Sequence, residues 1–223
     1  MFSQFSHLWQ STLNWQPTAE QELQFERLYN LVLEGNQIQN LTRITEPQDF
    51  WEKHLWDSLR GVMPFFGQEN LQAIDIGTGA GFPGLPCAIA QPTWQITLLD
   101  SRQKKTAFVK QVIEKIQLVN GRTLAGRSEE IGRIQVHRQK YDLALIRAVG
   151  SAELCAQYAL PFLKSGGQAV LYRGQWSDKE QEELTKACET IGAEIVKVET
   201  FFTPLTASIR HCIYLAPYFS TSV

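Results

Sequence analysis

A glycine-rich loop that follows a short apolar run is the part of this sequence best suited to bind a cofactor. Residues 71–84 read LQAIDIGTGAGFPG and place glycines at Gly77, Gly79, Gly81 and Gly84. Glycine adopts φ > 0 without strain and, having no Cβ, lets the backbone approach a ligand closely. A buried strand, a glycine loop and a helix start together predict a nucleotide-type site.

The spacing of the glycines and the acid before them indicate which cofactor the loop favours. The dinucleotide fingerprint requires a glycine where Phe82 stands, so this pattern departs from it. Asp75 also disfavours a pyrophosphate, because like charges repel at short range. S-adenosylmethionine carries an ammonium and a sulfonium group but no phosphate, so the acid favours that cofactor. The alternative is a tight strand-to-helix turn that binds no ligand.

A second acid follows the next predicted strand, residues 94–99. Asp100 lies 23 residues beyond Gly77, close to the offset of about 20 at which a ribose-binding acid is expected. Its carboxylate can accept hydrogen bonds from both ribose hydroxyls. The alternative is that Asp100 caps the helix that begins near Arg102. Taken together with the loop, the ribose role is favoured.

Several segments resemble one bacterial enzyme family. They read IDIGTGAGFPG, LLDSRQKK, GRSEEI and LIRAVGS, and the similarity extends from NLTRITEPQDFWEKHLWDSL to YRGQ, about residues 40–175. These segments resemble the 16S rRNA (guanine-N7) methyltransferase G family, also called the glucose-inhibited division protein B family. The resemblance implies a class I S-adenosylmethionine-dependent methyltransferase that methylates N7 of a guanosine in 16S rRNA of the small ribosomal subunit.

The resemblance also implies which residues form the site. In this family Ser128 and Glu129 match the adenine contact, although Ser128 would also cap a short helix. The segment around His54 would form a substrate-side wall, and Arg147 would bind the cofactor carboxylate or an RNA phosphate. The expected cofactor-binding residues are Asp75, Gly77, Gly79, Gly81, Phe82, Asp100, Ser101, Arg102, Ser128, Glu129 and Arg147. The expected RNA-contacting residues are Asn40, His54, Asp57, Ser58, Lys104, Lys105 and Arg173.

The end of the fourth predicted strand bears on the type of methyl transfer. Amino-group methylases of adenine commonly carry Asn or Asp followed by Pro-Pro-aromatic there, and cytosine-C5 methylases need a nucleophilic cysteine. Residues 146–149 read Ile-Arg-Ala-Val and offer neither. Guanine N7 attacks through a lone pair and loses no proton, so the enzyme has mainly to align the reactants. No catalytic residue is predicted.

Charge is unevenly distributed along the chain. Residues 102–147 contain eleven Lys or Arg and four acids, a balance of +7, in a chain whose net charge is −2. Such a basic third can bind a polyanion locally. The alternative is that these charged residues are ordinary solvent-exposed positions of helices and loops.

Composition narrows the class of protein. The 223 residues, 43% of them hydrophobic, suit one α/β core with an appendage. No run of 18 apolar residues and no signal-peptide pattern occurs, so we expect a cytoplasmic protein that binds no membrane. The four cysteines and four histidines are scattered, so neither disulfides nor a metal site is expected. We also expect a monomer.

The N-terminal part is predicted to be a helical cap, residues 1–60. Helices are expected at 4–13, at 18–35 and at 47–59. Thr18 and Gln21 form a capping-box pattern that starts the second helix, and Gly35 should end it. In the third helix His54 is spaced to pair with Asp57 or Ser58. A histidine beside a carboxylate suggests a general base, but a hydrogen bond within the helix is favoured.

The methyltransferase domain, residues 61–223, should hold a Rossmann-like, mostly parallel sheet of seven strands. The last two strands should form an antiparallel hairpin at its edge. The strands are expected at 71–76, 94–99, 122–125, 141–146, 168–172, 194–202 and 209–215, with helices at 102–117, 151–163 and 178–191 and a turn at 164–167. The rival functions are a class I methyltransferase acting on another RNA, a protein or a small molecule, and a non-catalytic nucleotide-binding module.

Overall fold

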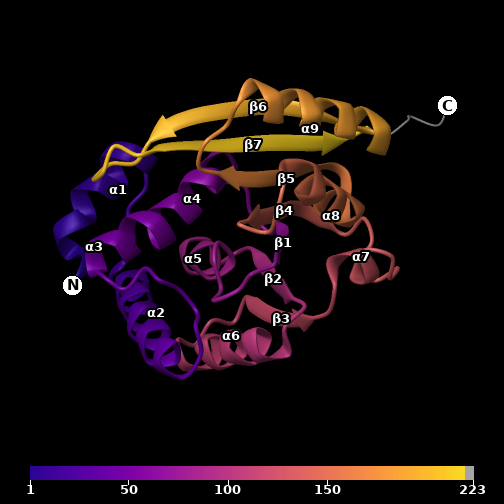
Figure 1. Ribbon diagram of the computed structural model, residues 1–223. Helices are drawn as coiled ribbons and strands as arrows, with labels where there is room; N and C mark the ends of the chain where they lie inside the picture. Colours follow the sequence, from indigo (N-terminus) through magenta and orange to yellow (C-terminus); the bar gives the residue numbers. More distant parts are fainter. Residues whose placement is uncertain (219–223) are drawn as a thin grey trace.

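One seven-stranded sheet organises the computed structural model, which describes residues 1–218 (Figure 1). The strand order is β3-β2-β1-β4-β5-β7-β6. Strands β1 to β5 run parallel, whereas β7 pairs antiparallel with both β5 and β6. The predicted fold, a mostly parallel sheet closed by an antiparallel hairpin, is confirmed. The strands are β1 (Gln72–Ile76), β2 (Gln95–Asp100), β3 (Gly121–Ala125), β4 (Tyr141–Arg147), β5 (Leu163–Arg173), β6 (Ala193–Phe202) and β7 (Ile209–Pro217).

Helices cover both faces of the sheet (Figure 1). One face packs against the N-terminal helices, α5 and α6, and the other against α7, α8 and α9. Parallel strands covered on both faces are nearly continuous apolar runs, as β2 and β4 are. The helical elements are η1 (Phe2–Phe5), α1 (Ser6–Leu13), α2 (Ala19–Ile38), α3 (Pro47–Phe50), η2 (Trp51–Trp56), α4 (Asp57–Val62), η3 (Met63–Phe65), α5 (Gly84–Ala90), α6 (Gln103–Lys115), α7 (Ser128–Ile131), α8 (Ala152–Ala159), η4 (Leu160–Phe162) and α9 (Asp178–Ile191).

The order of the strands reverses beside β1, and this determines where a ligand can bind. Strands β2 and β3 lie on one side of β1, and β4 lies on the other. In open α/β sheets ligands bind at such a switch point, outside the carboxyl ends of the strands. The glycine loop leaves β1 at this edge and leads into α5.

The second helix starts as predicted but does not end at Gly35. Thr18 and Gln21 form the capping box, and α2 continues to Ile38. A Cβ added to Gly35 would lie 2.4 Å from Cε2 of Phe108 on α6. The prediction was therefore wrong about this glycine, because it permits close packing of α2 on α6 and does not terminate the helix.

The third predicted helix is present, but its middle is a π-helix. α3 and α4 flank η2, in which the backbone bonds close over five residues. The spacing assumed for His54 does not hold across this wider turn. Its ring contacts Thr42 and Arg147, whereas the Ser58 hydroxyl donates to the His54 carbonyl. The expected pairing of His54 with Ser58 within the helix thus occurs through the His54 carbonyl, whereas the ring bonds to residues outside the helix.

The predicted turn at residues 164–167 lies inside β5. Tyr141 pairs with Leu163, and Leu143 pairs with Gln168. The residues between Leu163 and Gln168 therefore bulge out of the ladder. Gly166 there has φ +76°, a value that suits glycine.

In the described part of the chain, no helix is long and apolar enough to cross a bilayer.

Candidate active site

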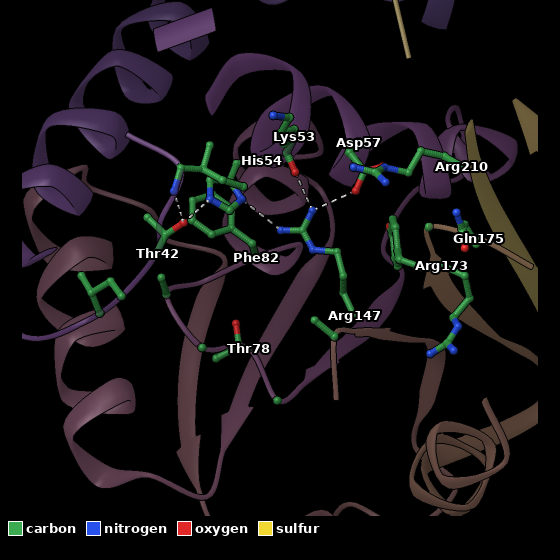
Figure 2. A pocket seen from close by; sticks show the side chains of 18 of the residues that line it. Thr42, Lys53, His54, Asp57, Thr78, Phe82, Arg147, Arg173, Gln175 and Arg210 are labelled. Carbon is green, nitrogen blue, oxygen red and sulfur yellow. Dashed lines mark hydrogen bonds and ion pairs between the residues drawn. The ribbon is translucent and has the colours of Figure 1, made fainter. Parts of the chain in front are cut away.

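Two adjoining pockets lie along the carboxyl edge of the sheet, and Gly77 lines both. The larger has a volume of about 730 Å³ and lies between the sheet edge and the N-terminal helices (Figure 2). The smaller, of about 300 Å³, lies beyond the ends of β1 and β2. The glycine loop is thus the wall between the two pockets.

Backbone bonds hold this loop, and there is open space beside one of its glycines, Gly79. The amides of Gly77 and Thr78 donate to the Leu99 carbonyl at 2.8 and 2.9 Å. Gly77 has φ +71°, and an added Cβ would lie 2.6 Å from Cγ2 of Val149. Gly79 has φ +59°, and its added Cβ would meet nothing nearer than 3.9 Å. A ligand can therefore approach the backbone at Gly79, as the sequence predicts.

Asp75 lies beneath the loop and lines neither pocket. Its Oδ2 accepts from the Thr78 hydroxyl at 2.5 Å and from the Gly84 amide at 2.8 Å, and its Oδ1 is buried without a partner. Burial raises the pKa of this carboxyl from 3.8 to about 6, although both hydrogen bonds oppose the rise. The side chain braces the loop, and its contact with a cofactor ammonium stays a prediction.

The raised pKa gives Asp75 a testable effect on stability. Below about pH 4 both the folded and unfolded states hold the proton, and between pH 4 and about 6 only the folded state does. The free energy of unfolding contributed by Asp75 therefore falls as the pH rises through this window. We expect Asp75→Asn to gain about 2–3 kcal/mol relative to the parent across it, measured by urea unfolding at each pH.

A second variant checks the cause of that shift. Thr78→Val removes a hydrogen bond that lowers the pKa of Asp75. In this variant the pH range over which the free energy of unfolding falls should therefore extend to higher pH. A difference between Asp75→Asn and the parent that stays constant with pH would show that Asp75 is not the titrating group.

The smaller pocket combines carboxylates with an apolar wall. Asp100 and Ser101 line it together with Ser128 and Glu129, and Tyr158 and Leu154 add apolar surface. This mixture suits a nucleoside, whose base is apolar on its faces and whose ribose offers hydroxyl donors.

The Asp100 carboxylate already holds the backbone on two sides. Oδ2 accepts from the Gly79 amide at 2.9 Å and Oδ1 from the Arg102 amide at 2.8 Å. Arg102 itself is exposed and lines neither pocket. The ribose role of Asp100 stays a prediction, and its contact with the glycine loop is an addition that the sequence did not indicate.

Arg147 ends β4 and reaches across the larger pocket to the N-terminal helices (Figure 2). Its Nη1 donates to the Lys53 carbonyl at 2.9 Å and to Asp57 Oδ2 at 3.0 Å, and its Nη2 lies 3.4 Å from His54 Nδ1. Nε of Arg210 lies 3.6 Å from Asp57 Oδ1. Asp57 is thus held between two arginines. The Arg147 Nε–H has no acceptor in the described part of the chain, so it can still bind a carboxylate.

The His54 ring is engaged at both nitrogens. Nδ1 faces the Arg147 donor, so Nε2 carries the proton and donates to Thr42 Oγ1 at 2.9 Å. The ring stacks on Phe82 with centroids 4.2 Å apart. Burial first, and then the charges of Arg147 and Lys53, hold the pKa of His54 well below its usual range. A neutral ring whose acceptor nitrogen is occupied does not suit a general base.

The other predicted RNA residues are divided among four places. Arg173 lines the larger pocket, where it donates to the Gly150 carbonyl and to Glu180. Lys105 donates to the Asn40 carbonyl at 2.8 Å outside both pockets. Lys104 lines a separate groove, and Ser58 is buried. The pocket also contains residues that the sequence did not single out, namely Thr42, Lys53, Gln175, Glu180 and Arg210.

Known structures share this fold. TYW2 of M. jannaschii, in complex with AdoMet, matches with a TM-score of 0.57 at 15% identity, over 73% of this chain and 74% of that one. Precorrin-6y C5,15-methyltransferase of Geobacter metallireducens GS-15 matches with a TM-score of 0.52 at 15% identity, over 72% and 86%. The chain therefore has the fold of the class I methyltransferases. No group of three or more potential metal ligands occurs in the described residues.

The sequence comparisons identify the family. The GidB model, described as rRNA small subunit methyltransferase G, matches residues 21–212. The ribosomal RNA small subunit methyltransferase G of Nostoc punctiforme is 52% identical over 100% of this chain and 93% of its own length. That of Trichormus variabilis is 53% identical over 96% and 90%. The chain belongs to this family of S-adenosylmethionine-dependent rRNA methyltransferases.

Proposed function

We propose that this protein transfers the methyl group of S-adenosylmethionine to N7 of a guanosine in 16S rRNA of the small ribosomal subunit. Family membership supports the rRNA substrate, since relatives that match nearly the whole chain carry the name small subunit methyltransferase G. The observation that carries the N7 assignment is the make-up of the larger pocket. It offers neither a free base nor a nucleophile.

The residues of both pockets fit the cofactor. The open space beside Gly79 and the carboxylate of Asp100 suit a nucleoside in the smaller pocket, with Ser101, Ser128 and Glu129 around it. The loop from Gly77 to Phe82 and the remaining donors of Arg147 suit the amino-acid end. When bound, S-adenosylmethionine supplies an electrophilic methyl group. The chain's task is then to orient the acceptor nitrogen and exclude water.

The side chains near the larger pocket argue against a reaction that needs a proton acceptor. His54 is neutral and hydrogen-bonded at both nitrogens, and Asp57 is held by two arginines. Guanine N7 carries a lone pair and no proton, so it needs no base. This match between acceptor and pocket favours N7 over an exocyclic amino group.

The cysteines also argue against methylation at a ring carbon. Cys87 and Cys155 are buried and line neither pocket. Burial raises the pKa of both thiols, so neither offers the thiolate that a C5 mechanism needs. The larger pocket, at about 730 Å³, is nevertheless large enough to receive an extruded base.

The product gives the direct test. A guanine methylated at N7 carries a fixed positive charge, which weakens the glycosidic bond and opens the imidazole ring to reduction. Small-subunit RNA treated with the enzyme and cofactor should therefore be cleaved at a single new site by borohydride followed by aniline. Primer extension locates that site.

Controls separate the possible products. Heat-unfolded enzyme, and reactions without cofactor, should leave the RNA uncleaved. Label that appears in N6-methyladenosine, in C5-methylcytidine or in a protein would reject the N7 assignment while leaving the methyltransferase fold intact. Binding of S-adenosylhomocysteine without any transfer to RNA, protein or small molecules would instead indicate a non-catalytic module.

We also propose that the enzyme acts as a cytoplasmic monomer with a helical cap, residues 1–60, on a methyltransferase domain, residues 61–223. The placement of the cap on the domain is supported by the apolar core that the N-terminal helices share with the sheet. Arg147 further joins the two parts across the larger pocket.

A further inference from the structure

A groove lined by residues of α2 and α6 lies outside both pockets. The two helices are neighbours in the fold (Figure 1). Its volume is about 480 Å³, and its apolar lining includes Phe108 and Leu31. Ile38 lies at the end of α2 and is 88% exposed, although it belongs to this lining. An exposed isoleucine over an apolar groove is costly in water, so the surface suits a partner that covers it.

The rim of this groove is cationic. Lys104 and Lys115 line it from α6 and are exposed, and Glu34 is the only acid among the lining residues. The whole of α6 carries four lysines against one acid, Glu114. Lysines beside an apolar floor suit a single-stranded nucleic acid, whose bases have apolar faces and whose phosphates are anionic.

One short segment of the chain links the lining of the groove to that of the larger pocket. Gln39 lines the groove, and Leu41 and Thr42 line the pocket. Lys105 on α6 holds Asn40 between them through its carbonyl, at 2.8 Å. The three steps from Ile38 to Leu41 span at most about 11 Å. Successive bases lie at least about 3.4 Å apart, the spacing of a stacked strand, so a base in the groove is at most about three nucleotides from one in the pocket.

We propose that the α2–α6 groove binds an unstacked rRNA base close to the target guanosine, with Lys104 and Lys115 contacting the flanking phosphates. This inference rests on the proposed function, because it places the RNA that leads into the larger pocket. Ile38 contacts the base, and the segment from Gln39 to Thr42 guides the strand towards the pocket. The groove thereby reads an unpaired stretch beside the target, which a fully stacked helix does not present.

Photo-crosslinking tests the location. The native cysteines are all buried, so an Ile38→Cys variant offers a single exposed thiol for a benzophenone reagent. Val136→Cys is the matched control, since Val136 is also exposed, at 71%, and lines none of the pockets described here. With small subunits and cofactor, the label at position 38 should crosslink to rRNA within about three nucleotides of the methylated guanosine. The label at position 136 should not.

Measurements of RNA affinity test the role of the two lysines. Replacing Lys104 and Lys115 together by Gln should lower the salt slope of RNA binding by about 1.4, the value for two single-strand phosphate contacts. The KM for RNA should rise, with kcat and the affinity for S-adenosylhomocysteine unchanged. The control pair Lys140→Gln and Lys186→Gln removes two exposed lysines elsewhere and should leave the slope unchanged.

The outcomes separate this inference from the function it rests on. If the parent methylates rRNA but position 38 crosslinks no more than position 136, the groove proposal falls alone. Crosslinks from position 38 to a ribosomal protein, or binding to phosphatidylglycerol vesicles that requires Lys104 and Lys115, would also overturn it. If the parent methylates no RNA, the proposed function falls first.

Discussion

Gly77→Val should reduce the affinity for S-adenosylhomocysteine at least about 100-fold, equivalent to about 2.8 kcal/mol. Two effects add. Gly77 has φ +71°, a conformation that a β-branched residue adopts only with strain. An added Cβ would also lie 2.6 Å from Cγ2 of Val149. Since Gly77 lines both pockets, the valine side chain would lie where the two pockets adjoin. Calorimetry measures the affinity.

A second glycine supplies the matched control. Gly67 also has a positive φ, +86°, but an added Cβ would meet nothing within 4 Å, and it lines neither pocket. Gly67→Val should therefore lower the free energy of unfolding by about 1–2 kcal/mol and leave ligand affinity unchanged. If folded Gly77→Val bound the ligand as tightly as the parent, the glycine loop would not be the cofactor site.

The sheet and the glycine loop could be predicted because their signals are local. Strand β2 is an apolar run that ends at an acid, and the four glycines after Asp75 leave few alternatives to a tight turn. The boundaries of α9 also followed from local features, since Ser177 and Glu180 form a capping box and Gly192 ends the helix in the left-handed region. Patterns of this kind need no knowledge of distant residues.

The π-helix was not predicted, and neither was a contact that it makes with the other end of the chain. Glu52 is buried, and its Oε1 accepts from the amides of Leu205 and Thr206 at 2.6 and 3.0 Å. Oε2 accepts from the Thr206 hydroxyl at 2.6 Å. A buried carboxylate needs such partners, but nothing near Glu52 in the sequence shows that residues 205 and 206 supply them.

The arrangement of the candidate site was also only partly visible in the sequence. The family segments picked out His54, Asp57 and Arg147, and the structure brings all three together. Their mutual contacts were not foreseen, since His54 was expected to bond within its own helix. Arg210 was missed because it lies on β7, far along the chain, and belongs to none of those segments.

Arg147→Ala should be among the most damaging substitutions in the larger pocket. It leaves Asp57, whose side chain is 8% exposed, with one distant cation, and it leaves three acceptors without their donor. Breaking a buried pair of this kind costs about 3–5 kcal/mol, and urea unfolding should show a loss of about 3 kcal/mol. The loss should be smaller when Asp57 is already replaced by Ala, because no buried carboxylate is then left without its partner. Arg147→Lys should be intermediate, since one ammonium cannot reach all three acceptors.

An ion pair between an arginine and a glutamate elsewhere in the protein provides a control that separates effects on stability from effects on catalysis. Arg60 lies 3.0 Å from Glu199, with side chains 12% and 17% exposed, and lines neither pocket. Arg60→Ala should lose comparable stability yet retain kcat, whereas Arg147→Ala should lose at least about 100-fold in kcat, or about 2.8 kcal/mol of transition-state stabilisation. The pKa of His54, followed by NMR, should also rise, because the Arg147 charge is one cause of its depression. If folded Arg147→Ala kept the kcat of Arg60→Ala, Arg147 would be a structural brace that takes no part in positioning the reactants.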